Sequence, residues 1–307
     1  MLGANMARFR LLAAWLSLTV GLGLAAGCGL LRFGVGGDYA QSPLLRVPPP
    51  RWPAARTVRV VTFNIKDLYW LSEHRGPRMA ALGALLAAAE PDVVCLQEAF
   101  VGGDVATIAE ALAGVGVAHA VDFPAGVVGS GLCVLSRFPV AERYFLKFTR
   151  NGAMLDTRGG DWWAGKGVAL ARLQVAPGEF LDVYNTHMIC GLGPADLHWH
   201  RQAQVRELAS FVVGAAPENV PALLMGDFNC WGGTPEFEFL AQALRWQPLG
   251  SRWVDHVCGW SHGDGYRFTP QARQWVQGRA VVDEQTGQSV DLSDHAGILV
   301  DVHIVAR

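Results

Sequence analysis

Residues 222–229 read ALLMGDFN, a run of apolar side chains that stops at Asp227 and Asn229. A short apolar run closed by polar, turn-forming residues is typical of a buried β-strand. Polar side chains at the end of such a strand stand where the loops of α/β folds assemble their ligand sites. The stretch therefore predicts a strand over Ala222–Asp227 in the core of an α/β fold, and its polar carboxyl end is a candidate position for a ligand site.

The same pattern recurs along the chain from Thr57 onward, where short apolar runs alternate with stretches of helical periodicity. The other strands are expected at Val58–Phe63, Val93–Gln97, Gly131–Ser136, Val168–Val175, Phe180–Thr186, Trp253–Cys258 and Gly297–Ile304. Helices are expected at Arg78–Ala89, Val105–Ala113, Leu197–Val213 and Thr234–Ala243, the last with a good N-terminal cap.

The composition supports one large globular domain. Of 307 residues, 51% are hydrophobic and only 17% are charged, which excludes a disordered chain and allows a large core. The formal net charge of -2 gives no positive field over the whole molecule, so no long nucleic acid is expected as a partner. The six cysteines form no CxxC pair that would suggest a zinc or thioredoxin-like site. Cys95 and Cys133 lie in apolar runs and are expected to be buried thiols.

The first 31 residues read as a targeting segment, because Arg8 and Arg10 precede an uncharged stretch that ends at Leu31. The stretch LAAGC, which ends at Cys28, is similar to a bacterial lipobox, whose cysteine takes a lipid after cleavage. A lipoprotein signal, an uncleaved anchor and an ordinary cleaved signal remain open, and each predicts export to the cell envelope or beyond. Residues 32–56, rich in proline, are expected to be a tether to a main domain over 57–307.

Five segments place polar residues at the ends of expected strands. Taken singly, each has an ordinary structural explanation, such as an asparagine in a turn or a histidine in the core. In chain order the five segments are Thr62-Phe63-Asn64, Leu96-Gln97-Glu98, Asn185-Thr186-His187, Gly226-Asp227-Phe228-Asn229 and Ser293-Asp294-His295.

These five motifs, in this order over residues 57–307, resemble the endonuclease/exonuclease/phosphatase superfamily of metal-dependent phosphoesterases. Residues 69–79 (YWLSEHRGPRM), 130–137 (SGLCVLSR) and 160–167 (GDWWAGKG) are similar to its neutral sphingomyelinase-like branch. The resemblance implies a DNase I-like, four-layer α/β sandwich of two packed, mainly antiparallel sheets flanked by helices. It also implies that Asp161 and Lys166 belong to a mobile loop that switches the site on.

Two positions depart from that branch. Ile65-Lys66 follows Asn64 in place of the more frequent Cys-Trp, and Val254-Asp255-His256 replaces the usual Ile-Asp-Tyr. Because Asp255 is kept, its role is expected to be kept too.

The implied chemistry suits a hard divalent cation, which offsets the negative charge of a phosphodiester and stabilises the leaving oxygen. Glu98 and Asn64 are the expected Mg²⁺ ligands, and Asp294 could ligate a second ion. One or two ions are expected, and Mn²⁺ or Co²⁺ could substitute.

The attacking water must lose a proton, a task for an imidazole whose tautomer is fixed by a carboxylate. His295 is the expected general base and Asp255 its orienting partner. Asp227 and Asn229 would position the water or a second metal. The sequence leaves open whether Asp227 or His295 takes the proton.

His187 would donate to a non-bridging phosphate oxygen or help the leaving group, and Lys166 would add positive charge there. A surface ion pair between Asp161 and Lys166 across a glycine-rich turn is the alternative for those two residues.

Aromatic residues flank the expected site, where exposed rings could rest in a lipid interface, surround a choline group or merely cover the core. They are Tyr69, Trp70, Trp162, Trp163 and Trp231.

The sequence therefore predicts a Mg²⁺-dependent phosphodiesterase that cleaves a phospholipid headgroup bond in the manner of a phospholipase C. The preference for a sphingomyelin-like lipid rests on the resemblance. A secreted nuclease, a phosphatase of soluble phosphate esters and an inactive, membrane-tethered binding module are the alternatives. A phospholipid membrane is the expected partner, no protein partner is identifiable, and we expect a monomer.

Overall fold

The computed structural model describes residues 49–52, 55–152, 161–190, 196–276, 281–284 and 287–307. Cys28, the expected targeting segment and most of the expected tether lie outside the described residues. Trp52, near the end of that tether, is buried, and its indole Nε1 donates to the Phe180 carbonyl at 3.1 Å. Within the described part of the chain, every helix is too short or too polar to cross a lipid bilayer.

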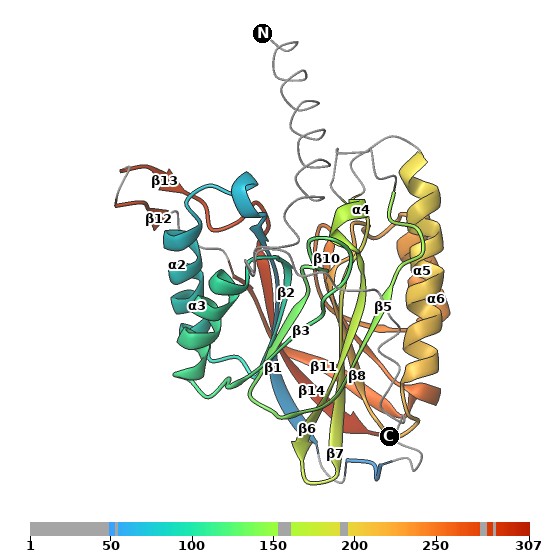
Figure 1. The fold of residues 1–307 in the computed structure, drawn as a ribbon. Helices are drawn as coiled ribbons and strands as arrows, with labels where there is room; N and C mark the ends of the chain where they lie inside the picture. Colours follow the sequence, from blue (N-terminus) through green and yellow to red (C-terminus); the bar gives the residue numbers. More distant parts are fainter. Residues whose placement is uncertain (1–48, 53–54, 153–160, 191–195, 277–280, 285–286) are drawn as a thin grey trace, which may run out of the picture. The chain divides into compact units, whose positions relative to one another are not determined.

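Two six-stranded sheets form the centre of the fold (Figure 1). The first sheet has the order β11 (Tyr266–Val276), β14 (Gly297–Ala306), β1 (Arg56–Asp67), β2 (Val93–Ala99), β4 (Cys133–Ser136) and β3 (His119–Asp122). The second has the order β5 (Val140–Lys147), β6 (Gly167–Ala176), β7 (Glu179–His187), β8 (Ala222–Asp227), β10 (Asp255–Trp260) and β9 (Gln247–Arg252).

Each sheet has one parallel pair near its middle, β1 with β2 and β7 with β8, while the other ladders are antiparallel. The expectation of mainly antiparallel sheets is confirmed. Because parallel neighbours point the same way, the carboxyl ends of these strands lie side by side within each sheet. The antiparallel strands β10 and β14 begin at that same end, which we call the site end of the sheets.

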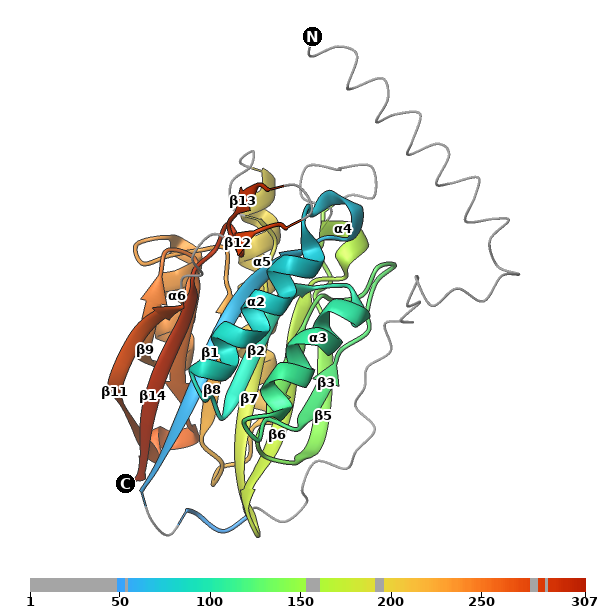
Figure 2. The same cartoon turned by 90° about the vertical axis from the view of Figure 1, so that its left-hand side faces the viewer.

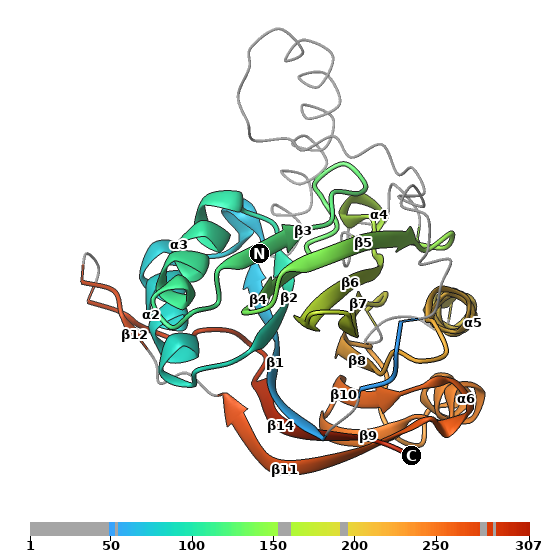
Figure 3. The ribbon, with the colours of Figure 1, turned by 90° about the horizontal axis from the view of Figure 1, so that it is seen from below.

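Helices cover the outer face of each sheet (Figures 2 and 3). The first sheet carries α2 (Arg75–Ala88) and α3 (Gly102–Ala113), and the second carries α5 (Asp196–Ala215) and α6 (Pro235–Leu244). One apolar core lies between the two sheets, and one more lies between each sheet and its helices. The expected four-layer α/β sandwich is therefore confirmed.

Strand β1 shows why the sequence folds into these layers. Val58 and Val60 join the core between the sheets, whereas Val61 and Phe63 join the core beneath α2 and α3. Successive side chains of a strand point to opposite faces, so a strand that is covered on both faces reads as a continuous apolar run.

All eight expected strands and all four expected helices are present, with shifted ends except for β8, whose bounds are as predicted. Four residues expected in strands lie outside them, Gly131, Leu132, Trp253 and Val254, and the first of each pair has a positive φ angle, 69° at Gly131 and 52° at Trp253. Strands β3, β5, β9 and β11 were not expected from the sequence. The short elements are η2 (Tyr69–Leu71), α4 (Asp161–Ala164), η3 (His262–Asp264), β12 (Val281–Val282) and β13 (Ser289–Val290).

Candidate active site

Two carboxylates and an amide meet where β1, β2 and β8 end. The Asn64 Nδ2 group donates to Glu98 Oε1 and to Asp227 Oδ2, both at 3.1 Å. Asn64 and Asp227 are buried. The Asn64 Oδ1 atom accepts from the Lys66 backbone N–H at 3.1 Å, so Glu98 offers the freer oxygen atoms.

Burial raises the pKa of Glu98, and the charge of Asp227 raises it further, although Lys166 and the Asn64 hydrogen bond oppose both effects. Burial also raises the pKa of Asp227 to about 6, with the nearby Asp255 carboxylate adding to the shift. Oxygen ligands that are desolvated and repel one another fit a divalent cation, because its charge relieves both costs.

The second group is built from β7 and the segment before β6. Lys166 is buried, and its ammonium lies 2.8 Å from Asp161 Oδ1, 2.7 Å from His187 Nε2 and 3.2 Å from the Met188 carbonyl oxygen. The ammonium therefore donates to His187 and Met188 and forms an ion pair with Asp161. Burial lowers the pKa of Lys166, but the charges of Asp161 and Glu98 outweigh this and raise it.

His187 is a neutral imidazole in this setting. Burial and then the charge of Lys166 lower its pKa well below the ordinary value. Because Lys166 donates to Nε2, the proton lies on Nδ1, which is buried and has no hydrogen-bond partner among the described residues. The Nε2 atom lies 3.4 Å from Asp227 Oδ2 and 3.9 Å from Glu98 Oε1, so His187 faces both carboxylates.

The third group is a histidine–carboxylate pair at the starts of β10 and β14. His295 Nδ1 lies 2.9 Å from Asp255 Oδ2, and His295 Nε2 lies 3.9 Å from Asp227 Oδ2. Burial lowers the pKa of His295, but the hydrogen bond to Asp255 and the charges of Asp255 and Asp227 raise it to about 9. The Asp255 carboxylate thus fixes the ring and holds its proton.

Asp227, Asp255 and His295 also bring ligand atoms within 4.8 Å of one another, as a metal site would. Asp255 and His295 are already bound to each other, however, which favours proton transfer as the use of this group. The carboxylates of Glu98 and Asp227 remain the better fit to a cation.

Asn229 and Asp294 occupy different positions. The Asn229 backbone N–H donates to Asp227 Oδ1 at 2.9 Å, and its side chain donates to the Met188 carbonyl at 2.8 Å, so Asn229 braces the loop after β8. Asp294 is exposed and forms an ion pair with Lys66 at 2.8 Å.

Buried polar side chains tie the two sheets together beneath the site, a role that the sequence did not reveal. The Asn185 side chain donates to the carbonyls of Leu96 and Cys133 at 2.9 and 3.0 Å. Gln97 donates to Asn185 Oδ1 at 2.7 Å and to Thr62 Oγ1 at 3.0 Å. Each of these side chains belongs to a motif quoted from the sequence, which explains why polar residues precede Asn64, Glu98 and His187.

The expected aromatic contacts divide into two groups. Tyr69 stacks on Phe100 with ring centres 6.3 Å apart, and Trp162 meets Trp163 edge-on at 5.1 Å, so these rings are partly packed. Trp231 is exposed. The side chain of Trp70 lies outside the described residues. Three further exposed tryptophans were missed, Trp199, Trp253 and Trp275.

Comparison with known proteins identifies related chains. A sequence model of the Endonuclease/Exonuclease/phosphatase family matches residues 61–295. The inositol phosphosphingolipids phospholipase C of Schizosaccharomyces pombe is 33% identical over 177 residues, which are 57% of this chain and 42% of that protein. Sphingomyelin phosphodiesterase 2 of Rattus norvegicus is 35% identical over 174 residues, 56% of this chain and 41% of that protein. The alignment thus spans less than half the length of either relative.

A solved structure shares the fold. The crystal structure of beta toxin from Staphylococcus aureus, with bound magnesium ions, superposes with a TM-score of 0.64 at 17% identity. The match covers 80% of this chain and 99% of that chain.

Proposed function

The chain belongs to the Endonuclease/Exonuclease/phosphatase family, and from that premise we propose that it is a divalent-metal-dependent phosphodiesterase acting on a phospholipid. The proposal rests on the convergence of Glu98, Asp227, His187 and His295 at one end of two packed sheets. The relatives named for phospholipase C and sphingomyelin phosphodiesterase activity support the reaction class.

The Glu98 carboxylate, beside Asn64, would hold Mg²⁺, the ion bound in the beta toxin structure. Such an ion supplies positive charge that offsets the phosphodiester and stabilises the leaving oxygen. Asp294 pairs with Lys66 and would have to leave that partner to ligate a second ion.

His295 would accept the proton of the attacking water. Asp255 holds the ring through Nδ1, which leaves Nε2 facing Asp227 and the interior of the site. With a pKa of about 9, His295 carries a proton near neutral pH, so a base at this position works best in alkaline solution. Asp227, largely ionised at neutral pH, is the competing acceptor.

Lys166 would act through its charge. Its ammonium donates to His187 and Met188 and forms an ion pair with Asp161, so these protein groups already surround it. A buried ammonium nevertheless lowers the energy of negative charge that develops beside it. Asp161 would keep Lys166 in place.

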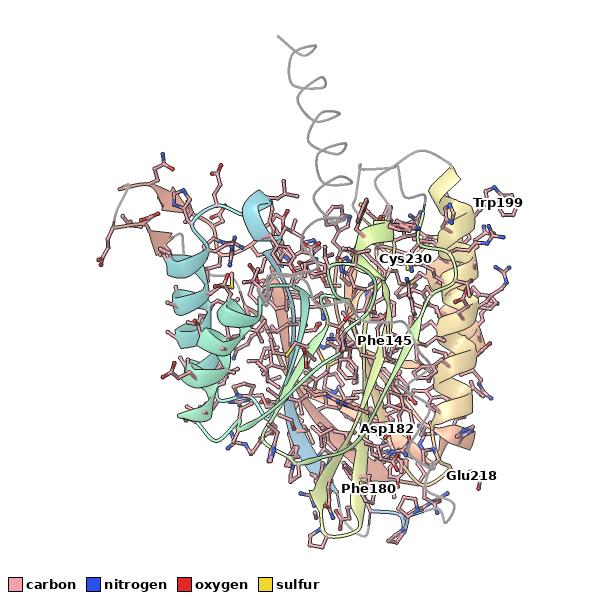
Figure 4. All side chains as sticks on the ribbon, viewed as in Figure 1. Phe145, Phe180, Asp182, Trp199, Glu218 and Cys230 are labelled. Carbon is pink, nitrogen blue, oxygen red and sulfur yellow. The ribbon has the colours of Figure 1, made fainter. Side chains whose placement is uncertain are left out.

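One observation favours a lipid surface over a soluble ester. Of the seven large apolar side chains that are exposed among the described residues, six lie on segments at the site end, and only Val213 does not. Trp199, at the start of α5, is 75% exposed, and Figure 4 places it at the same end as Cys230. We call these six residues the apolar rim: Leu71, Trp199, Trp231, Trp253, Trp275 and Val282.

Exposed tryptophan is unusual in a protein surrounded by water, whereas it is favoured where membrane meets water. Clustered exposed apolar side chains mark contact surfaces. Exposed apolar side chains at the end of the sheets that carries the catalytic groups would bring these groups to the headgroups of a lipid layer.

The test measures headgroup release from sphingomyelin vesicles by the full chain, with Mg²⁺ and with chelator, beside hydrolysis of the soluble diester bis-p-nitrophenyl phosphate. We expect both activities, and we expect chelator to abolish both. His295→Ala should lower kcat on both substrates by roughly 10² to 10⁴-fold. Hydrolysis of the soluble diester alone would remove the lipid assignment, and metal-independent hydrolysis would remove the mechanism.

A separate pair of variants tests the apolar rim. Trp199→Ser should lower activity on vesicles and leave hydrolysis of the soluble diester unchanged. Val213→Ser is the matched control, because Val213 is an exposed apolar residue of the same helix at the opposite end. Salt-sensitive cleavage of plasmid DNA without activity on vesicles would instead identify a nuclease.

We also propose that the N-terminal segment exports the chain and that Cys28 receives a lipid. The apolar stretch and its small residues before Cys28 support this. Incorporation of a labelled fatty acid by the natural chain but not by Cys28→Ala would support lipidation, and labelling of both would contradict it.

A further inference from the structure

The Arg78 side chain is buried on the far side of β1 from the carboxylates, and none of the chemistry above uses it. It closes the stretch RGPR over residues 75–78, part of a motif already singled out in the sequence. A buried arginine is costly unless every N–H group is satisfied, so its partners show what it holds.

The partners of Arg78 are backbone carbonyl oxygens from separate segments. Its Nε and Nη2 groups donate to Leu292 at 3.0 and 2.7 Å. Nη2 also donates to Ile65 at 2.7 Å. Longer hydrogen bonds reach Lys66 at 3.3 Å and Glu73 at 3.4 Å. The guanidinium therefore clamps the end of β1 to the loop that precedes β14.

Both clamped segments carry site residues. Ile65 and Lys66 directly follow Asn64, and Leu292 lies three residues before His295. Ser293 adds a second link, since its hydroxyl donates to the Asn64 carbonyl at 2.7 Å and accepts from the His295 backbone N–H at 3.2 Å.

The backbone at the clamp is held away from its relaxed state. Lys66 has a φ of 49°, a left-handed conformation that is unfavourable for a residue with a side chain. Such a conformation persists when surrounding contacts impose it. The carbonyl oxygen of Lys66 accepts from Arg78 and, at 2.6 Å, from the Ser72 hydroxyl.

We propose that Arg78 is a positioning residue that sets the spacing between the Asn64–Glu98 cation site and the His295–Asp255 pair. It acts through the backbone carbonyls of Ile65 and Leu292 and touches neither substrate nor cation. The inference rests on the proposed function, because it assigns that spacing a catalytic purpose.

The experiment compares the same substitution at two buried arginines. Arg78→Lys keeps the charge but loses the planar fork that reaches two segments at once. Arg172→Lys is the matched control, because Arg172 is fully buried and binds Asp182, which Figure 4 places toward the end away from Trp199 and Cys230. Both variants are studied well below their melting temperatures.

We expect Arg78→Lys to lower kcat on bis-p-nitrophenyl phosphate roughly 10²-fold, as for a displacement of about 1 Å, with KM changed less than about threefold. Mg²⁺ affinity, measured by calorimetry, should fall, and the NMR signal of the His295 Nδ1 proton should move. Arg172→Lys should lose stability while keeping kcat, Mg²⁺ affinity and that signal.

If folded Arg78→Lys keeps kcat, Mg²⁺ affinity and the His295 signal of the natural chain, the proposal is overturned. Should Arg78→Lys fail to fold, Arg78→Gln is measured in its place, since its shorter amide keeps N–H donors but cannot reach both segments at once. An Arg78→Gln protein with unchanged kcat, affinity and signal would also overturn the proposal. If the natural chain hydrolyses neither substrate, the proposed function fails, but the Mg²⁺ affinity and the His295 signal still test the clamp.

Discussion

At the scale of single residues, the Asp255 carboxylate controls the pKa of His295. The carboxylate raises the pKa of His295, so its removal should lower that pKa by about 1 to 3 units. A base must lose its proton to act, so activity should rise with pH through this pKa. For Asp255→Asn we expect the rising limb of the pH profile of kcat to move toward acid and the plateau to fall at least about tenfold.

The pH profile also separates the two candidate acceptors. If Asp227 takes the proton, the rising limb lies near its pKa of about 6. That limb should then persist in His295→Gln and move toward higher pH, because the charge of His295 no longer lowers the pKa of Asp227, whereas a limb that belongs to His295 disappears.

His256 governs stability rather than chemistry. Its Nε2 lies 2.8 Å from the Cys230 carbonyl and its Nδ1 lies 2.7 Å from Ser251 Oγ, and burial lowers its pKa to about 4. As the pH falls, His256 of the unfolded chain binds a proton near pH 6.5, whereas His256 of the folded chain binds a proton only near pH 4. The stabilisation is therefore complete above pH 6.5 and is lost as the pH falls toward 4, by about 3 kcal/mol.

The measurement is denaturant unfolding of the natural chain and of His256→Gln between pH 4 and 7. The natural chain should lose about 3 kcal/mol relative to the variant across this interval. If the unfolding free energies of the two proteins change with pH in parallel, His256 does not cause the loss of stability at low pH.

Sequence patterns predicted the residues that meet in the candidate site because polar side chains that end apolar runs are conspicuous. Asn64, Glu98, His187 and Asp227 were all found in this way. The Lys66–Asp294 ion pair could not be found, because it joins the end of β1 to the loop before β14, and their approach depends on the finished fold. The same holds for Arg78, whose partners are backbone carbonyls and leave no trace in the identity of the side chains.

At the scale of elements, Gly226 shows how one backbone position sets the site. It has a φ of 139°, and a Cβ atom there would lie 2.1 Å from the Thr186 carbonyl oxygen of the neighbouring strand. Gly226→Ala should therefore push β8 away from β7 and move Asp227, the next residue. We expect a loss of at least about 3 kcal/mol in unfolding free energy, more than the usual cost of overpacking, together with a lower kcat.

Gly214→Ala is the control for Gly226→Ala. Gly214 lies in α5 with open space around it, so alanine should leave stability unchanged or raise it by up to about 1 kcal/mol. Equal stability of the two variants, measured by denaturant unfolding, would contradict the proposed clash.

The strands that the sequence missed share a physical feature. Strand β11 lies at a sheet edge, carries Pro270 at a register shift and alternates exposed polar residues with few buried ones. Strand β5 is the edge of the other sheet and includes Glu142, Arg143 and Lys147. Edge strands need less apolar cover, so their sequences lack the runs that mark central strands.

At the scale of the whole molecule, the apolar pattern predicted the strands and helices, and the resemblance implied the four layers, whose boundaries each have their own core. The apolar rim is different, since it draws Leu71, Trp199, Trp253 and Trp275 from segments that are remote in sequence. No local sequence pattern predicts that these residues share one end of the molecule. They do so because their segments all lie at the site end of the sheets.

The rim makes a last prediction about how the full chain meets a lipid layer. A formal net charge of -2 provides little attraction to a charged surface, so apolar contact should dominate. Binding to zwitterionic vesicles, measured by flotation, should change less than about threefold between 50 and 500 mM salt, because the Debye length affects only charge interactions. Replacing both Trp199 and Trp253 by serine should weaken binding at least about tenfold, since burial of one large apolar side chain contributes about 1.5 to 3 kcal/mol. Binding that disappears in high salt and survives the double replacement would show that charge, and not the apolar rim, brings the chain to lipid.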